Sequence, residues 1–205
     1  MPAFAAVVMR RMAQITLLFA FGLSQVVHAG AQKEEALSDS IRVLLRQSVA
    51  GQIQQYRPFT SNADERAFLY WRANMAQRMA RFVAEPESRN LVLNAVDYEA
   101  LRAGLEPALV LGVIQVESHF QPSAKSPVGA RGLMQVMPFW SRTIGDGRID
   151  GLNGVRTNIR YGCVILRYYL DKENGDLVRA LARYNGSLGK THYAEQVLQA
   201  AAQWR

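Results

Sequence analysis

The chain has 205 residues, enough for one ordinary domain with a small extension. Hydrophobic residues make up 49% and charged residues 20%, which supports a sizeable core and argues against a chain that is disordered throughout. Basic residues outnumber acidic ones by 24 to 17. The resulting charge of +7 indicates an anionic partner but does not distinguish nucleic acid, a membrane surface and an anionic wall polymer.

The N-terminus has the layout of a secretory signal peptide, which we place at residues 1–29. Two arginines precede an apolar run over residues 12–27, and small residues follow, with cleavage expected after Ala29 or Ala31. An uncleaved membrane anchor is the alternative, although the run is short for a span and contains polar residues. No cysteine lies near the cleavage point, which argues against a lipoprotein.

Cysteine and histidine are too sparse to indicate metal or disulfide chemistry. Cys163 is the sole cysteine and lies in an apolar stretch, where we expect a small buried side chain and not a nucleophile. His28 is removed with the signal peptide, and neither His119 nor His192 has the spacing of a metal site. We therefore predict that the protein has no metal and no cofactor.

The pattern after the signal peptide is helical almost throughout, so the predicted fold class is mainly α. In residues 30–88, apolar side chains recur at helical spacing over residues 41–49 and again over residues 68–82. Asn62 and Glu65 resemble a capping pair at the start of the second of these helices. Core packing is the expected role of the aromatic and methionine side chains. We interpret residues 30–88 as a helical extension.

Further helices are expected over residues 87–102, ending at Gly104, and from Pro107 to about His119. Residues 122–154 are rich in Gly, Ser, Pro and Asn, which predicts a loop with room for a small hairpin. Three helical segments follow this loop: residues 158–172, 176–184 and 193–204.

The helix that begins at Pro107 carries an acid on an apolar face. Val110, Val113, Ile114 and Glu117 follow one another at helical spacing and therefore share one side of the helix. Burial raises the pKa of a carboxyl group, and the C-terminal end of a helix also disfavours negative charge. A carboxyl group that stays protonated near neutral pH can act as a general acid. The alternative is a glutamate at the rim of the core, paired with an arginine.

The residues that follow this acid form a characteristic segment, in which Glu117-Ser118 leads into the run AKSPVGARGLMQVMP at residues 124–138. This segment resembles the ES…AxSxxGAxGLMQxMP pattern of the soluble lytic transglycosylase (SLT domain) family of the lysozyme-like superfamily. Three later segments match in the same order: NIxxG at 158–162, ALAxYN at 180–185, and YxxxV at 193–197. These motifs cover about residues 90–205, and we place the catalytic domain at residues 89–205.

The resemblance implies a mainly α, lysozyme-like α+β fold with Glu117 as the catalytic acid. It also implies that six further residues surround the substrate: Ser126, Met134, Gln135, Tyr184, Asn185 and Tyr193. The amide of Gln135 suits the N-acetyl and hydroxyl groups of a sugar, and the thioether of Met134 suits a sugar face. Three of the six have structural alternatives: Tyr193 in the core, Asn185 as a helix cap and Ser126 as a turn residue. The chain departs from the family pattern at Gly186-Ser187 and at Phe139-Trp140.

Members of this family cleave the β-1,4 bond between N-acetylmuramic acid and N-acetylglucosamine and leave a 1,6-anhydromuramoyl end. They use a single glutamate, whereas an ordinary glycosidase needs two carboxylates. Asp146 and Asp150 are the only acids in the 122–154 loop. A lysozyme-type hydrolase that uses one of them to position water is the first alternative, and a non-catalytic wall-binding module is the second.

The resemblance also predicts the surroundings of the protein. We expect a monomer in the periplasm of a bacterial envelope, bound to peptidoglycan glycan strands. Export makes nucleic acid an improbable partner, and an anionic wall explains the positive charge equally well. The helical extension packs on the catalytic domain or docks onto a larger envelope assembly, and its sequence favours neither.

Overall fold

The computed structural model describes residues 32–51 and 57–205, so the predicted signal peptide lies outside the described residues. The elements in chain order are α2 (Asp39–Val49), α3 (Asn62–Met79), α4 (Pro86–Arg102), α5 (Pro107–Ser118), α6 (Pro138–Ile144), the 3-10 helix η1 (Ile149–Asn153), α7 (Val155–Lys172), α8 (Leu177–Asn185) and α9 (His192–Ala202). None of the helices among the described residues combines the length and the hydropathy needed to cross a bilayer.

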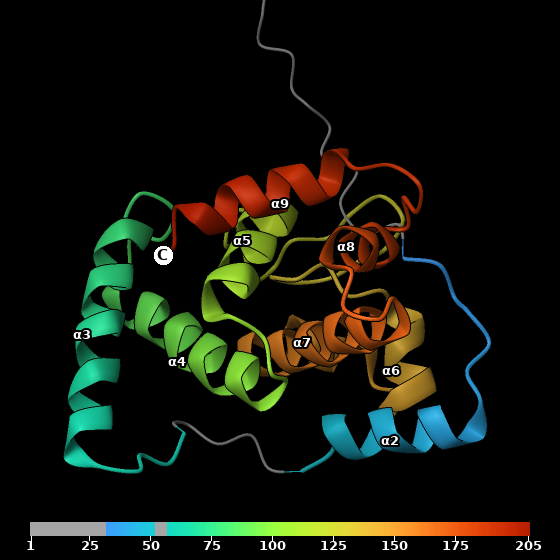
Figure 1. Cartoon of the computed structure of the whole chain (residues 1–205), viewed down its shortest axis with the longest axis horizontal. Helices are drawn as coiled ribbons and strands as arrows, with labels where there is room; N and C mark the ends of the chain where they lie inside the picture. The colour runs from blue at the N-terminus through green and yellow to red at the C-terminus, as the bar shows by residue number, and fades with distance from the viewer. Residues whose placement is uncertain (1–31, 52–56) are drawn as a thin grey trace, which may run out of the picture.

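Helix α5 lies at the centre of the molecule, with α9 along one side of it and α4 and α7 crossing beneath (Figure 1). Nine of its twelve residues are buried, as expected for a helix surrounded by others. Gly112 lets α9 approach closely, because a Cβ atom at this position would lie 2.8 Å from the backbone nitrogen of Ala201. The close contact fixes the position of α5 relative to α9.

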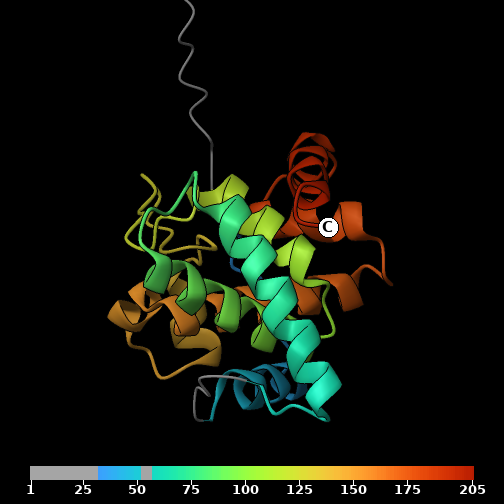
Figure 2. The same cartoon turned by 90° about the vertical axis from the view of Figure 1, so that its left-hand side faces the viewer.

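The helices of the extension pack onto the rest of the chain from two sides. Helix α2 contacts α6 and α7, and α3 crosses α4 on the face of the molecule that is turned toward the viewer in Figure 2. Leu45 of α2 and Met75 and Met79 of α3 are buried in the same apolar core as α5 and α7. The apolar face of α3 therefore serves core packing, as predicted, whereas in α2 Leu45 is buried and Leu44 is 57% exposed.

A buried ion pair joins α4, α7 and the segment that follows α2. Nε of Arg160 donates to Glu99 at 2.8 Å, and both side chains are at most 3% exposed. Arg102 donates to the other carboxylate oxygen of Glu99 at 2.9 Å. Arg160 also donates to the carbonyl of Gly51 at 3.0 Å. These contacts fasten the extension to the helices beneath the site.

Two local predictions are wrong. The cap of α3 is Ser61, whose hydroxyl accepts from the backbone N–H of Asp64 at 3.1 Å, so the predicted Asn62 and Glu65 box lies one residue too far along the chain. The 122–154 segment is not all loop, because it contains α6 and η1. Helices of seven and five residues are too short to show a hydrophobic period.

The small hairpin expected in this loop exists only as two isolated bridges in the described part of the chain. Lys125 pairs with Arg131, and Arg131 pairs with Val136, in antiparallel fashion. No strand forms around either bridge in the residues that the structure describes. The loop is therefore held by single backbone hydrogen bonds, such as that from Gly132 to Ala124, and by side chains of the surrounding helices.

Candidate active site

Glu117 occupies the last turn of α5, and the chain turns sharply immediately after it. His119 and Phe120 both adopt left-handed backbone conformations, with φ of 50° and 63°. Such values are uncommon for residues other than glycine, and they often accompany functional sites. They end the helix at Ser118 and direct the chain into the loop that faces Glu117.

The carboxyl group of Glu117 is enclosed, with the residue only 5% exposed. Its Oε1 accepts a hydrogen bond from the hydroxyl of Tyr193 at 2.6 Å, while Oε2 is buried and accepts none from the described residues. Burial raises the pKa of Glu117 to about 8, and the Tyr193 hydrogen bond opposes part of that rise. The expected rise in pKa is thus present. Within the described residues no arginine pairs with this acid, which argues against the core-rim alternative.

A cavity of about 250 Å³ lies beside Glu117. It is lined by residues 116–119 at the end of α5, by residues 124–127 of the loop, and by Gln135. The structure therefore brings three of the predicted site residues together: Glu117, Ser126 and Gln135. Among the described residues that line this cavity, Glu117 is the only acid.

Ser126 and Gln135 both shape the loop that forms the far wall of this cavity. The hydroxyl of Ser126 accepts from the backbone N–H of Ala130 at 3.0 Å, which closes a turn at Gly129. Gln135 has φ of 45° and donates through Nε2 to the carbonyls of Gly132 at 2.9 Å and Ala124 at 3.2 Å. The turn role considered for Ser126 is present, and it is compatible with a position on the cavity wall.

Of the remaining predicted residues, Met134 and Tyr184 lie deeper, whereas Asn185 is only partly buried. Met134 is fully buried against Gly162, where an added Cβ atom would lie 2.3 Å from the methionine sulfur. Its side chain therefore offers no exposed surface to a sugar in this structure. Tyr184 is also fully buried and donates to the carbonyl of Met134 at 2.7 Å. Asn185 ends α8 and donates to the hydroxyl of Ser187 at 3.2 Å.

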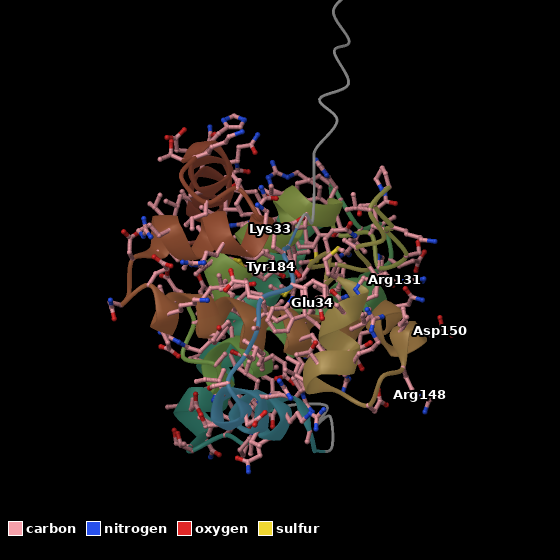
Figure 3. The ribbon with its side chains drawn as sticks, turned by 90° about the vertical axis from the view of Figure 1, so that its right-hand side faces the viewer. Lys33, Glu34, Arg131, Arg148, Asp150 and Tyr184 are labelled. Atoms are coloured by element: carbon pink, nitrogen blue, oxygen red, sulfur yellow. The ribbon has the colours of Figure 1, made fainter. Side chains whose placement is uncertain are left out.

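A segment of the extension covers this part of the site, which the sequence did not predict. Residues 32–37 form an irregular segment without secondary structure, and in the view of Figure 3 this segment passes in front of Tyr184. Gln32 is 4% exposed and accepts from the backbone N–H of Met137 at 3.3 Å. Burial raises the pKa of Tyr184 well above its ordinary value.

Ion pairs fix the same segment to α7 and α8. Glu35 pairs with Arg183 at 3.0 Å and also with Lys172. Sequence patterns could not reveal these contacts, because the partners lie more than 130 residues apart in the chain. Residues 32–37 of the extension are therefore part of the surroundings of the site.

The two aspartates considered as second carboxylates are exposed and do not line the cavity beside Glu117. Asp146 accepts from the backbone N–H of Arg148 at 2.9 Å, which is a local turn contact. Figure 3 shows Asp150 and Arg148 at the periphery of the molecule. Among the described residues, no group of three or more acidic, histidine or cysteine side chains is arranged to hold a metal ion.

Comparison with known proteins shows what the chain is similar to. The sequence model of the Transglycosylase SLT domain family matches residues 94–204. A "Transglycosylase" of Enterobacteria phage PRD1 is 38% identical over 89 residues, which is 43% of this chain and 32% of the relative. "Membrane-bound lytic murein transglycosylase F" of Desulfosudis oleivorans is 31% identical over 115 residues, which is 55% of this chain and 24% of the relative. The chain thus spans a third or less of the length of these relatives.

A solved structure supports the fold. An inactive variant of the lytic transglycosylase Slt from Pseudomonas aeruginosa matches with a TM-score of 0.50 and 24% sequence identity, over 65% of this chain and 29% of that one. This likeness confirms the predicted fold, mainly α and lysozyme-like. The family match covers more than half of the chain. The chain therefore belongs to the Transglycosylase SLT domain family.

Proposed function

We propose that this protein is a lytic transglycosylase that cleaves the β-1,4 bond between N-acetylmuramic acid and N-acetylglucosamine in peptidoglycan. The observation that carries the proposal is the position of Glu117, whose carboxyl group has a pKa of about 8. Glu117 lines a cavity together with the loop that contains the family motif. Near neutral pH this group holds a proton and can act as a general acid. Relatives that act on murein support peptidoglycan as the substrate.

In the first step, Glu117 transfers its proton to the glycosidic oxygen as the bond to C1 of the muramoyl residue breaks. The substrate's own N-acetyl group stabilises the cationic sugar that results. Glu117 is then ionised in a buried place, where the hydroxyl of Tyr193 donates to Oε1 and stabilises its charge. We expect this hydrogen bond to strengthen as the negative charge develops.

In the second step, the Glu117 carboxylate removes the proton of the C6 hydroxyl, whose oxygen closes onto C1. The product is a 1,6-anhydromuramoyl end, and Glu117 regains the proton that it donated. The cycle consumes no water, so a single carboxyl group serves both as acid and as base. Two-carboxylate hydrolysis would require a second acid near the bond, and the described lining residues include none.

The lytic assay is a direct test of catalysis. Purified wall suspended with the wild-type protein should lose turbidity, whereas Glu117→Gln should fold and leave the turbidity almost unchanged, because the amide cannot donate the acidic proton. The matched control is Gln115→Glu, which makes the reverse exchange of an amide for a carboxyl group two residues away on α5. Equal lysis by wild type and Glu117→Gln would refute the assignment. Binding of wall without lysis by either protein would favour the wall-binding module.

The location and partners belong to the same proposal. We infer that the protein is exported to the periplasm, where its substrate lies, on the basis of the N-terminal pattern and the envelope location in the names of its relatives. Its excess of basic residues suits an anionic wall polymer. Fractionation of cells that express the full chain tests this location. Recovery with the cytoplasmic proteins would contradict it.

A further inference from the structure

Three helices each supply one side chain that forms a hydrogen bond with the backbone of Leu133 or Met134, in the loop opposite Glu117. From α5, the hydroxyl of Ser118 donates to the carbonyl of Leu133 at 2.8 Å. From α7, Oδ1 of Asn158 accepts from the N–H of Met134 at 2.7 Å. From α8, the hydroxyl of Tyr184 donates to the carbonyl of Met134 at 2.7 Å. Together with the backbone hydrogen bonds between Arg131 and Val136, these side chains therefore set the position of this turn.

Asn158 makes the most contacts of the three. It is 1% exposed, and besides accepting from Met134 it donates through Nδ2 to the carbonyls of Arg131 and Leu152, both at 2.8 Å. Both amide hydrogens and the amide oxygen are thus used, which fixes the orientation of the side chain. One residue of α7 thereby holds both ends of the turn at 131–134 and the end of η1.

The surrounding residues fit closely around this amide. At Gly132 an added Cβ atom would lie 2.4 Å from Nδ2 of Asn158, and the backbone there has φ of +73°, which favours glycine. Gln135, which lines the cavity beside Glu117, follows directly and donates to the carbonyl of Gly132 at 2.9 Å. A shift of the Asn158 amide would therefore move the wall of the cavity relative to Glu117.

We propose that Asn158 is a positioning residue, which sets the distance between the turn that carries Gln135 and the carboxyl group of Glu117. Asn158 does not line the cavity, so it acts through Met134 and Arg131 and not through the substrate. This inference rests on the proposed function, because glycan cleavage provides its kinetic readout. It assigns a role to the asparagine of the NIxxG motif, which the resemblance alone left without one.

The chemistry of the Asn158 amide suggests a test based on pH, with a result that a merely structural role would not produce. In Asn158→Asp, an ionised carboxylate would face the carbonyls of Arg131 and Leu152 with no hydrogen to donate. Burial raises the pKa of such a carboxyl group, and the protonated form can donate to one of the two carbonyls. The defect should therefore lessen as the pH falls. Asn158→Leu, of similar size, should show the full defect at every pH.

The experiment measures kcat and KM for glycan cleavage from about pH 4 to about pH 8, at temperatures where circular dichroism shows each variant to be folded. We expect kcat of Asn158→Leu to fall by roughly 10- to 100-fold with a smaller change in KM, because the reacting groups are misplaced. The activity of Asn158→Asp relative to wild type should rise by about tenfold toward acidic pH. The control is Asn94→Asp, another buried asparagine, which accepts from Arg72 on the far side of α4; its relative activity should not depend on pH.

Amide hydrogen exchange makes the inference independent of activity. The N–H of Met134 should exchange slowly in the wild type and at least about tenfold faster in Asn158→Leu, which offers it no acceptor. Unchanged protection, an unchanged kcat in the leucine variant, or a pH-independent defect in the aspartate variant would each overturn the positioning role. A wild-type protein that cleaves no glycan would refute the proposed function instead. The exchange measurement would then still decide whether Asn158 holds the turn.

Discussion

At the scale of single residues, the last turn of α5 disfavours the charged form of Glu117 in two ways. The carboxyl group is buried, and the C-terminal end of a helix presents partial negative charge to it. The Tyr193 hydroxyl opposes both effects at one oxygen only. The result is an acid that keeps its proton near neutral pH and yet has a donor ready to stabilise its anion.

Replacement of Tyr193 by phenylalanine tests this balance. Removal of a hydrogen bond to the charged form raises the pKa of Glu117 further, so the alkaline limb of the pH profile of kcat/KM should move to higher pH. We also expect kcat to fall by roughly 10- to 100-fold, because a hydrogen bond to a charged group is worth roughly 1.5–3 kcal/mol. Tyr70→Phe, at a position 75% exposed, is the control and should leave the profile unchanged. An alkaline limb that stays in place would show that Tyr193 does not tune this acid.

The same burial predicts how stability depends on pH. The pKa of Glu117 is raised from an ordinary 4.5 to about 8 in the folded protein, so the folded state holds this proton more tightly than the unfolded chain. The contribution of the protonated group is complete below about pH 4.5 and is lost as the pH rises toward about 8. Glu117→Gln cannot ionise and should escape this loss.

Thermal or urea unfolding of both proteins measures the effect. The stability of Glu117→Gln relative to wild type should increase between about pH 4.5 and about pH 8, by up to roughly 4 kcal/mol. The control is Glu65→Gln on an exposed part of α3, whose stability difference from wild type should stay nearly constant. A constant difference for Glu117→Gln would mean that the carboxyl group is ionised in the folded protein at neutral pH.

At the scale of elements, the site depends on how α4, α7 and the extension are joined beneath it. Glu99 binds Arg160 and Arg102, and Arg160 reaches the segment after α2. A charge buried this deeply is destabilising if its partner is removed, because the guanidinium loses its compensating carboxylate. Removal of Glu99 should therefore lower the free energy of unfolding several times more than removal of an exposed ion pair does.

We predict that Glu99→Ala lowers the free energy of unfolding by about 3–5 kcal/mol in urea titrations. Glu106→Ala removes an ion pair with Arg205 whose side chains are more than half exposed, and should cost less than about 1 kcal/mol. Equal costs for the two variants would mean that the buried pair contributes no more than a surface pair does.

The short elements show where sequence patterns stop being informative. The spacing of Val110, Val113, Ile114 and Glu117 was sufficient to predict both the helix and the raised pKa, because it depends on one helix alone. Helix α6 has too few residues for a period, and its first residue, Pro138, is also compatible with a loop. The burial of Met134 depends on Gly162 of another helix, and no local pattern records that contact.

At the scale of the whole molecule, the family motifs locate the site better than they describe it. Glu117, Ser126 and Gln135, which belong to the motif around the acid, line one cavity. The motifs do not reveal that residues 32–37 cover Tyr184, because this segment lies outside the motifs and its contacts are distant in sequence. The roles of Asn185 and Tyr184 toward a glycan remain predictions.

The central claim is that one acid cleaves the glycan without water, and mass spectrometry of digested peptidoglycan tests it most directly. Wild-type protein should release muropeptides with 1,6-anhydromuramoyl ends, each lighter by one water than the corresponding hydrolytic product. When the digestion is run in oxygen-labelled water, these ends should contain no labelled oxygen. Muropeptides with reducing, oxygen-labelled muramoyl ends would contradict the account and identify a lysozyme-type hydrolase.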